Sequence, residues 1–344
     1  MNRLLPAFLA LAAGLGVLPA ASRAAPVGGD YVYTGSIDLG APGGWDYASF
    51  DPVAGRDYVG HTDKVSVVDT ASRKLVGQVG PMDRAHGAAI LPALGRGFAT
   101  SGDDGMLKEF DLSDLHIVKQ IPVGKDDDGI IADPHSGAII VTIGDGKQLV
   151  IVDAAAGAVA HTVDLPGEPE FPAADGRGNA YVNIASTSHL AKVDIASGRI
   201  EAVWALPGCV SPHGLAYDYR TGRLFTGCAN STLLVVDPKD GRIVASLPTG
   251  PFSDAVAVDE ARHRVFCPNG NGTLTVIDEE PGDAYAVLRT IPTFLGARSM
   301  TIDPRSGELF ITYGDTQIVS GPRDPGGLRF GWAGAKVATF MPND

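Results

Sequence analysis

The sequence comprises 344 residues, with 27 Lys and Arg against 40 Asp and Glu and a formal net charge of −13 at pH 7. Such an acidic chain repels a phosphate backbone unless a local basic stripe compensates, and the sequence contains no such stripe. Nucleic acid is therefore excluded as a principal partner. The length is compatible with a single domain, because all-β folds of this size are often one unit.

The first 24 residues have the pattern of a secretory signal peptide. Met1-Asn2-Arg3 is a short positive segment, and residues 4–18 form an apolar run rich in Leu and Ala. Residues 22–24 (Ser-Arg-Ala) place small side chains at both key positions of a cleavage site. The apolar run is too short for a transmembrane helix, which needs about 20 residues. We expect an exported protein, periplasmic or secreted, with no membrane span and a single mature domain over residues 25–344.

From residue 31 onward the chain repeats itself about every 42 residues, the length of one propeller blade. One series consists of short apolar strands that end in aspartate, at Asp69, Asp111, Asp153, Asp194, Asp237 and Asp278. A second series consists of turn-forming pairs that begin at Asp51, Leu91, Asp133, Asp175, Asp218, Asp259 and Asp303. The two series alternate and define seven registers.

Each register predicts four short β-strands. No run of about ten residues keeps a 3.6-residue apolar period, which argues against long helices. The predicted fold class is therefore all-β, a seven-bladed β-propeller with four-stranded blades. The seventh register runs out before its fourth strand, and residues 31–40 resemble the missing outer strand. We expect this N-terminal strand to join the C-terminal blade and close the ring, which removes two free sheet edges.

Two strands carry a resemblance to a known family. Residues 179–183 (Asn-Ala-Tyr-Val-Asn) and 307–313 (Gly-Glu-Leu-Phe-Ile-Thr-Tyr) are degenerate versions of one signature strand. In these repeats, over about residues 31–340, the chain resembles the YVTN family of β-propellers, which includes the YncE-like periplasmic proteins. The resemblance implies the propeller fold. It implies no single function, because related propellers serve as enzymes, electron-transfer scaffolds and binding modules.

One ionisable residue in each register lies five positions before the turn-forming pair. These residues are Asp46, His86, Asp128, Glu170, His213, Asp254 and Arg298. The first strand of each blade lies against the propeller axis, so its start opens at one mouth of the central channel. We expect the seven side chains to form a ring there. Carboxylates crowded in one concave site repel one another, and a ligand or cation commonly relieves that repulsion.

Two classes of small ligand fit this ring. His86 and His213, together with Asp128 and Glu170, offer nitrogen and oxygen ligands suited to one divalent ion such as Zn, Mn, Cu or Ni. The two histidines belong to blades three apart, so a shared ion requires them to reach across the channel. Alternatively, Arg298 binds the carboxylate or phosphate of a small anionic ligand. One divalent ion is the only cofactor that the sequence suggests, since it has no C-x-x-C-H haem motif.

Three functions follow from this ring and remain open. The first is a binding or scaffold protein that holds a small ligand or metal in the funnel. The second is a metal-assisted hydrolase or lyase that uses the same ring. The family resemblance suggests a calcium-dependent lactonase for this class. If the ring instead binds an organic ligand, His86 is a candidate general base or acid. The third is a protein-interaction platform, in which the outer loops bind a partner and the ring is merely structural.

Three cysteines in an exported protein leave at least one unpaired. Cys209 precedes the first strand of the fifth register and Cys228 ends its second strand. Antiparallel neighbours place these ends side by side, so we predict a disulfide between them near the channel mouth. Cys267 falls within a second strand and is expected to be a buried thiol. His61 is expected on a loop at the same mouth.

Overall fold

The computed structural model describes residues 31–41, 43–319 and 329–343. The predicted signal peptide at residues 1–24 lies outside the described residues. The described part of the chain contains 28 strands and two short 3-10 helices, η1 (Pro92–Leu94) and η2 (Ala185–Thr187). Neither of these helices has the length or apolar character that crossing a membrane requires.

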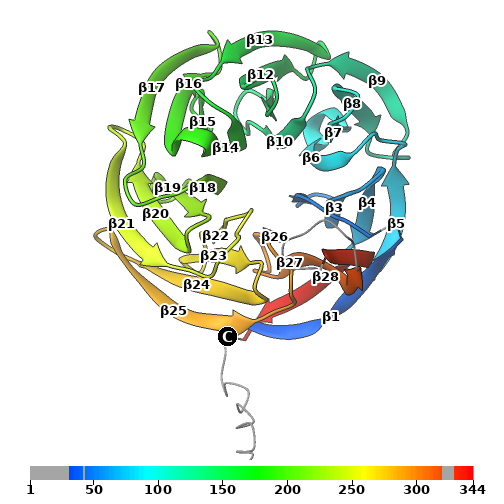
Figure 1. The fold of residues 1–344 in the computed structure, drawn as a ribbon. Helices are drawn as coiled ribbons and strands as arrows, with labels where there is room; N and C mark the ends of the chain where they lie inside the picture. Colours follow the sequence, from blue (N-terminus) through cyan, green and yellow to red (C-terminus); the bar gives the residue numbers. More distant parts are fainter. Residues whose placement is uncertain (1–30, 42, 320–328, 344) are drawn as a thin grey trace, which may run out of the picture.

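The strands form seven four-stranded antiparallel sheets around a central channel, which confirms the predicted seven-bladed propeller (Figure 1). Blade 1 contains β2 (Ala48–Asp51), β3 (Arg56–His61), β4 (Lys64–Asp69) and β5 (Lys74–Val79). Blade 2 contains β6 (Ala85–Leu91), β7 (Arg96–Ser101), β8 (Met106–Asp111) and β9 (Ile117–Pro122). Blade 3 contains β10 (Asp127–Ala132), β11 (Ile139–Ile143), β12 (Gln148–Asp153) and β13 (Ala158–Asp164). Blade 4 contains β14 (Pro169–Ala174), β15 (Asn179–Ile184), β16 (His189–Asp194) and β17 (Arg199–Ala205). Blade 5 contains β18 (Pro212–Asp218), β19 (Arg223–Cys228), β20 (Thr232–Asp237) and β21 (Arg242–Pro248). Blade 6 contains β22 (Ala257–Asp259), β23 (Arg264–Asn269), β24 (Thr273–Glu280) and β25 (Ala284–Pro292).

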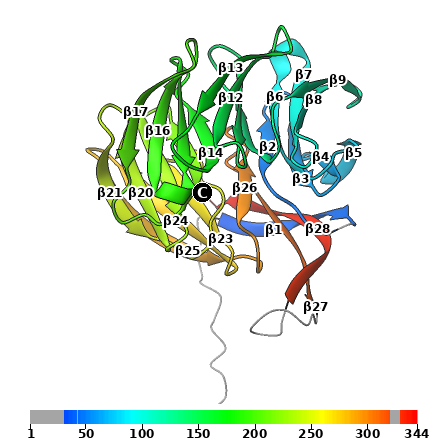
Figure 2. The same ribbon diagram turned by 45° about the horizontal axis from the view of Figure 1, so that its top comes forward.

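Blade 7 joins the two ends of the described chain, as the sequence predicts. Its strand order is β26 (Ser299–Ile302), β27 (Leu309–Val319), β28 (Arg329–Pro342) and β1 (Tyr31–Gly40). The N-terminal strand β1 runs antiparallel to β28, with Tyr31 opposite Pro342 (Figure 1). The ring of blades is thereby closed by strand pairing rather than by packing alone. Beyond the blade, β27 and β28 continue as a two-stranded extension (Figure 2).

The core consists of apolar layers between neighbouring blades. The middle strands are near-continuous runs of Val, Ile and Leu, as strands covered on both faces require. In β4, for example, Val65, Val67 and Val68 are fully buried. The outermost strands instead alternate between exposed and partly buried positions, as in β17 and β25. Burial of the middle strands holds neighbouring blades together. The starts of the inner strands lie outside these apolar layers and can carry polar side chains.

The repeated aspartates close turns within the blades. Asp69 Oδ1 accepts the backbone N–H of Ser72 at 2.7 Å, and Asp194 Oδ1 accepts that of Ser197 at 2.8 Å. These contacts are Asx-type turns, in which a short acidic side chain substitutes for a backbone acceptor. The aspartates of this series are therefore structural and separate from the ring at the channel mouth.

Candidate ligand-binding site

The seven predicted ring residues all lie where an innermost strand begins. His86, Asp128, Glu170 and His213 each occupy the second position of β6, β10, β14 or β18. Asp46, Asp254 and Arg298 lie just before β2, β22 and β26. The ring thus occupies the start of every inner strand, in agreement with the 42-residue repeat.

In blades 2 to 5, a β-bulge at the start of the inner strand sets the direction of the ring side chain. Pairing between the first and second strands shifts register between Ala85 and Ala88 in blade 2 and between Asp127 and Ile130 in blade 3. Blades 4 and 5 show the same shift at their first strands. Each shift encloses the ring residue. Because a bulge redirects a side chain out of the sheet's alternation, these residues can face the axis.

A left-handed backbone residue precedes the ring in most blades. Two positions before the ring residue, φ is positive at Gly44, Arg84, Asp126, Ser211, Phe252 and Gly296. A non-glycine residue in this conformation costs on the order of 1–2 kcal/mol. A repeated hydrogen bond holds it: the N–H of Gly102 donates to the Arg84 carbonyl at 2.9 Å, and that of Gly144 to the Asp126 carbonyl at 2.9 Å. The entry to most of the inner strands is therefore a fixed turn.

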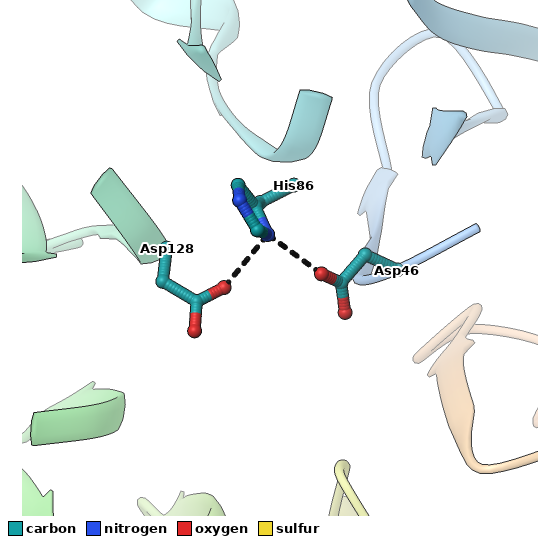
Figure 3. A group of neighbouring side chains, drawn as sticks. All are labelled: Asp46, His86 and Asp128. Atoms are coloured by element: carbon teal, nitrogen blue, oxygen red, sulfur yellow. Dashed lines mark hydrogen bonds and ion pairs between the residues drawn. The ribbon is translucent and has the colours of Figure 1, made fainter. Parts of the chain in front are cut away.

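Asp46, His86 and Asp128 form one tight group (Figure 3). His86 Nδ1 lies 2.7 Å from Asp46 Oδ2 and 2.9 Å from Asp128 Oδ1. His86 is only 3% exposed, whereas the two carboxylates keep about a quarter of their side-chain area in contact with solvent. One ligand atom from each residue lies within 4.8 Å of the others. Two carboxylates from flanking blades thus converge on a single imidazole nitrogen.

The charges in this group are strongly coupled. Burial disfavours the imidazolium form of His86, but hydrogen bonds and charge from Asp128 and Asp46 outweigh it and raise the pKa to about 10. Burial also raises the pKa of Asp46, against the hydrogen bond from His86. At neutral pH His86 is therefore an imidazolium that can donate a proton. This protonation state disfavours the general-base role considered from the sequence.

Packing fixes which nitrogen of His86 faces the carboxylates. His86 Nε2 is buried and forms no hydrogen bond within the described part of the chain. A Cβ placed on Gly102 would lie 2.6 Å from this nitrogen. The missing side chain at position 102 thus makes room for the imidazole ring. Nδ1 is the nitrogen left to meet Asp46 and Asp128.

Glu170, His213, Asp254 and Arg298 form a second, looser group. His213 Nδ1 lies 3.5 Å from Glu170 Oε1 and 3.8 Å from Asp254 Oδ1. Arg298 Nε lies 2.6 Å from Asp254 Oδ2, and nearly half of the arginine side chain is exposed. A hydrogen bond with Glu170 raises the pKa of His213. Burial raises the pKa of Asp254 to about 6, although Arg298 and His213 oppose the shift.

The two ring histidines therefore belong to different groups. Within residues 31–41, 43–319 and 329–343, the one set of three or more potential metal ligands is Asp46, His86 and Asp128. The sequence instead suggests His213 and Glu170 as further ligands of the same ion. In the structure Glu170 and His213 contact each other.

An aromatic pair crosses the channel directly beneath the ring. Tyr47 in blade 1 and Phe171 in blade 4 have ring centroids 4.7 Å apart. The Tyr47 hydroxyl lies 3.4 Å from Glu170 Oε2 and so links the pair to the second group. Beyond this pair, a cavity of about 880 Å³ continues between the inner strands, lined mainly by Ala, Ile and aromatic side chains. The pair thus separates the polar mouth from an apolar channel.

Two residues at the site escaped the sequence analysis, and one was misplaced. Asp127 is fully buried beside the ring, accepts the Ser101 N–H at 3.0 Å, and burial raises its pKa to about 7. Tyr47 follows a ring residue directly, but its reach across the channel has no sequence signal. The expectation for His61 is wrong: it is a fully buried residue of β3 and contacts Ser66 Oγ through Nδ1 at 2.9 Å.

The cysteines follow the strand geometry. Cys209 and Cys228 form a disulfide in blade 5, with their Cα atoms 5.4 Å apart. Cys267 is a buried thiol that contacts Ser253 Oγ at 3.0 Å, and burial raises its pKa to about 11. A thiol with such a pKa is protonated and unreactive at neutral pH.

Comparison with known proteins supports the fold and leaves the function open. No family model and no curated protein matches the chain. Hydrazine synthase of Kuenenia stuttgartiensis is similar with a TM-score of 0.68 and 14% identity, over 78% of this chain and 92% of that chain. The WD40 repeats of RRP9 are similar with a TM-score of 0.74 and 12% identity, over 89% of this chain and 97% of that chain. At such low identity these similarities establish the propeller fold alone.

Proposed function

We propose that this protein is an exported binding or scaffold propeller that holds one divalent cation at Asp46, His86 and Asp128. The convergence of two carboxylates on His86 Nδ1 is the observation that carries this proposal. One nitrogen and two oxygen donors suit Zn, Mn, Ni or Cu among the common divalent ions. A cation between the carboxylates would take over the neutralising role of the imidazolium.

The surroundings of the group support a pre-organised site. The bulges of blades 2 and 3 set His86 and Asp128, and Gly102 leaves space for the imidazole. Ligands held by packing lose little conformational freedom on binding, which favours affinity. The partly exposed carboxylates leave a route from solvent to the donor atoms.

The exported location and the family are part of the same proposal. The N-terminal sequence pattern supports export, and the degenerate signature strands support membership of the YVTN propellers. The disulfide between Cys209 and Cys228 is compatible with an oxidising compartment. Detection of the mature protein, beginning near Ala25, in the periplasmic fraction or the medium would support export.

Metal analysis of the purified protein tests the cation site. We expect about one equivalent of Zn²⁺ or Mn²⁺ to bind in calorimetric titration, and His86→Ala or Asp128→Asn to weaken binding at least about 100-fold. His116→Ala is the matched control, because His116 pairs with a single carboxylate, Asp114, on an exposed turn. If wild type takes up neither ion, or if both ring variants bind as wild type does, the site assignment is wrong.

Metal-assisted hydrolysis or lysis is a second candidate, favoured by the number of ligands. Three protein donors leave coordination positions for water or substrate, as in catalytic rather than structural metal sites. Turnover of lactones by the metal-loaded protein, absent in Asp128→Asn, would establish an enzyme. A loaded protein that binds the ion stoichiometrically but turns over no lactone would favour the binding role.

A further inference from the structure

A second pocket opens beside the ring, between the entry loops of blades 6, 7 and 1. Its volume is about 310 Å³, enough for a ligand of one or two rings. Its wall is formed by Trp45, Phe252, Leu295, Arg298 and three glycines, Gly44, Gly270 and Gly296. Trp45 directly precedes Asp46, so this pocket adjoins the proposed cation site. None of the three cation ligands lines it.

Two large apolar side chains face solvent at this pocket. Phe252 is 65% exposed and Leu295 is 51% exposed. Of the described phenylalanines, Phe252 is the one found among the exposed large hydrophobic residues. Most other exposed apolar side chains lie on outer strands, whereas these two meet at one polar mouth. An exposed apolar patch ringed by polar groups commonly marks a binding site.

The loop that carries Leu295 is anchored by its neighbours. Phe294 stacks on Tyr313 with centroids 3.9 Å apart. The Ala297 N–H donates to the Phe294 carbonyl at 3.0 Å, and the Gly296 N–H donates to the Gly270 carbonyl at 2.8 Å. These contacts fix the turn that carries Leu295, and the turn holds its side chain toward solvent.

Phe252 is fixed in a similar way. It has a left-handed backbone, with φ of 58°, and its carbonyl accepts the Gly270 N–H at 3.0 Å. A Cβ on Gly270 would lie 3.0 Å from Phe252 Cβ, so the glycine allows the aromatic residue to sit close above it. The pocket is therefore preformed, with an aromatic wall on rigid backbone.

Arg298 supplies the charge at this pocket. Its Nε atom contacts Asp254, while nearly half of the side chain stays exposed. Guanidinium groups bind carboxylates in a planar fork and stack on aromatic faces. The four ring carboxylates repel a dianion, so a monoanion fits this mouth better than a phosphate.

We propose that this pocket binds a small aromatic carboxylate, with its ring between Trp45 and Phe252 and its carboxylate on Arg298. The proposal goes beyond the cation site, because the pocket uses none of the cation ligands. Each can therefore fail without the other. A ligand seated here would lie beside the proposed cation, which makes the mouth a two-part recognition surface.

Calorimetric titration of the metal-free protein with 2-naphthoate and with uncharged 2-naphthamide tests the proposal. We expect wild type to bind naphthoate at least about tenfold more tightly than the amide, since a hydrogen bond to a charged group contributes more to affinity than one between neutral groups. Arg298→Met should abolish that preference. Phe252→Ala should weaken both probes. Arg305→Met is the matched control: Arg305 also pairs with an aspartate through Nε, at the opposite end of the inner strand of blade 7.

Three outcomes would overturn the proposal. Naphthoate and naphthamide binding equally would remove the role of the guanidinium. Naphthoate binding that persists in both Arg298→Met and Phe252→Ala would place the ligand elsewhere. No naphthoate binding to a wild-type protein of normal circular dichroism would show that the pocket does not take this class of ligand.

Discussion

The two ring histidines occupy the same repeat position but behave differently. His86 is buried, and its Nδ1 lies within 3 Å of two carboxylates. His213 is partly exposed, and its carboxylate partners lie 3.5 and 3.8 Å away. His213 Nε2 also has a polar neighbour, Ser211 Oγ at 3.2 Å, whereas His86 Nε2 packs against Gly102. The repeat sets where a side chain lies, while its neighbours set what it can do.

The largest expected difference is in folding stability. His86→Ala should lower the free energy of unfolding by about 3 kcal/mol, because it leaves the carboxylates of Asp46 and Asp128 without the buried imidazolium that neutralises them. His213→Ala should cost less than about 1 kcal/mol, since His213 is more exposed than His86 and its two carboxylate partners lie farther away, at 3.5 and 3.8 Å. Urea unfolding of both variants in EDTA at pH 7 measures the contrast. Equal losses would show that the two groups are electrostatically alike.

The pH dependence of that loss comes next. The folded-state pKa of His86, about 10, lies above its unfolded value, so its stabilisation is complete below about pH 6.5 and is lost as the pH rises through 10. The stability difference between wild type and His86→Ala should therefore shrink by about 2 kcal/mol between pH 7 and pH 9. Urea midpoints at both pH values measure it. A difference independent of pH would mean that His86 is neutral.

Two equivalent glycines allow a smaller steric test. Gly102→Ala would press a methyl group against His86 Nε2 and should cost about 1.5 kcal/mol. Gly144→Ala, at the equivalent position of blade 3, meets the end of the partly exposed Asp126 side chain, which can move aside. Thermal and urea unfolding compare the two. If Gly144→Ala costs as much as Gly102→Ala, the imidazole pocket is not the tighter of the two.

The smallest expected effect concerns Tyr47, which belongs to the aromatic pair across the channel and contacts Glu170 of the second group through its hydroxyl. Tyr47→Phe removes only the hydroxyl that lies 3.4 Å from Glu170, so it should cost less than about 1 kcal/mol. Cation binding should stay unchanged in the same variant, because the hydroxyl that is removed contacts Glu170 of the second group, while the hydrogen bond from the Tyr47 backbone N–H to the His86 carbonyl is kept. A loss of cation affinity would show that the aromatic pair couples the two groups of ring residues.

The sequence predicted the architecture well because the architecture is periodic. The recurring aspartate turns and the missing fourth strand of the last register yielded seven blades and the β1–β28 closure. The same periodicity brought all seven ring positions to one mouth, since each lies at the start of an inner strand.

Contacts between blades could not be predicted in this way. Which carboxylates reach His86, and that Tyr47 meets Phe171 across the axis, depend on side-chain direction and distance rather than on repeat position. His61 shows the same limit, because a histidine between Gly60 and the polar residues Thr62 and Asp63 is typical of a loop, yet it forms the buried end of β3. The split of the ring into two groups is thus a tertiary property.

Nitrogen-15 NMR of the imidazole side chains during a zinc titration tests the cation site most directly. We predict that one equivalent of zinc shifts the Nδ1 resonance of His86 and leaves that of His213 in place, because Nδ1 of His86 lies within 3 Å of two carboxylates and that of His213 does not. A shift at His213 instead, or zinc uptake with no change at His86, would contradict the assignment of the site to Asp46, His86 and Asp128.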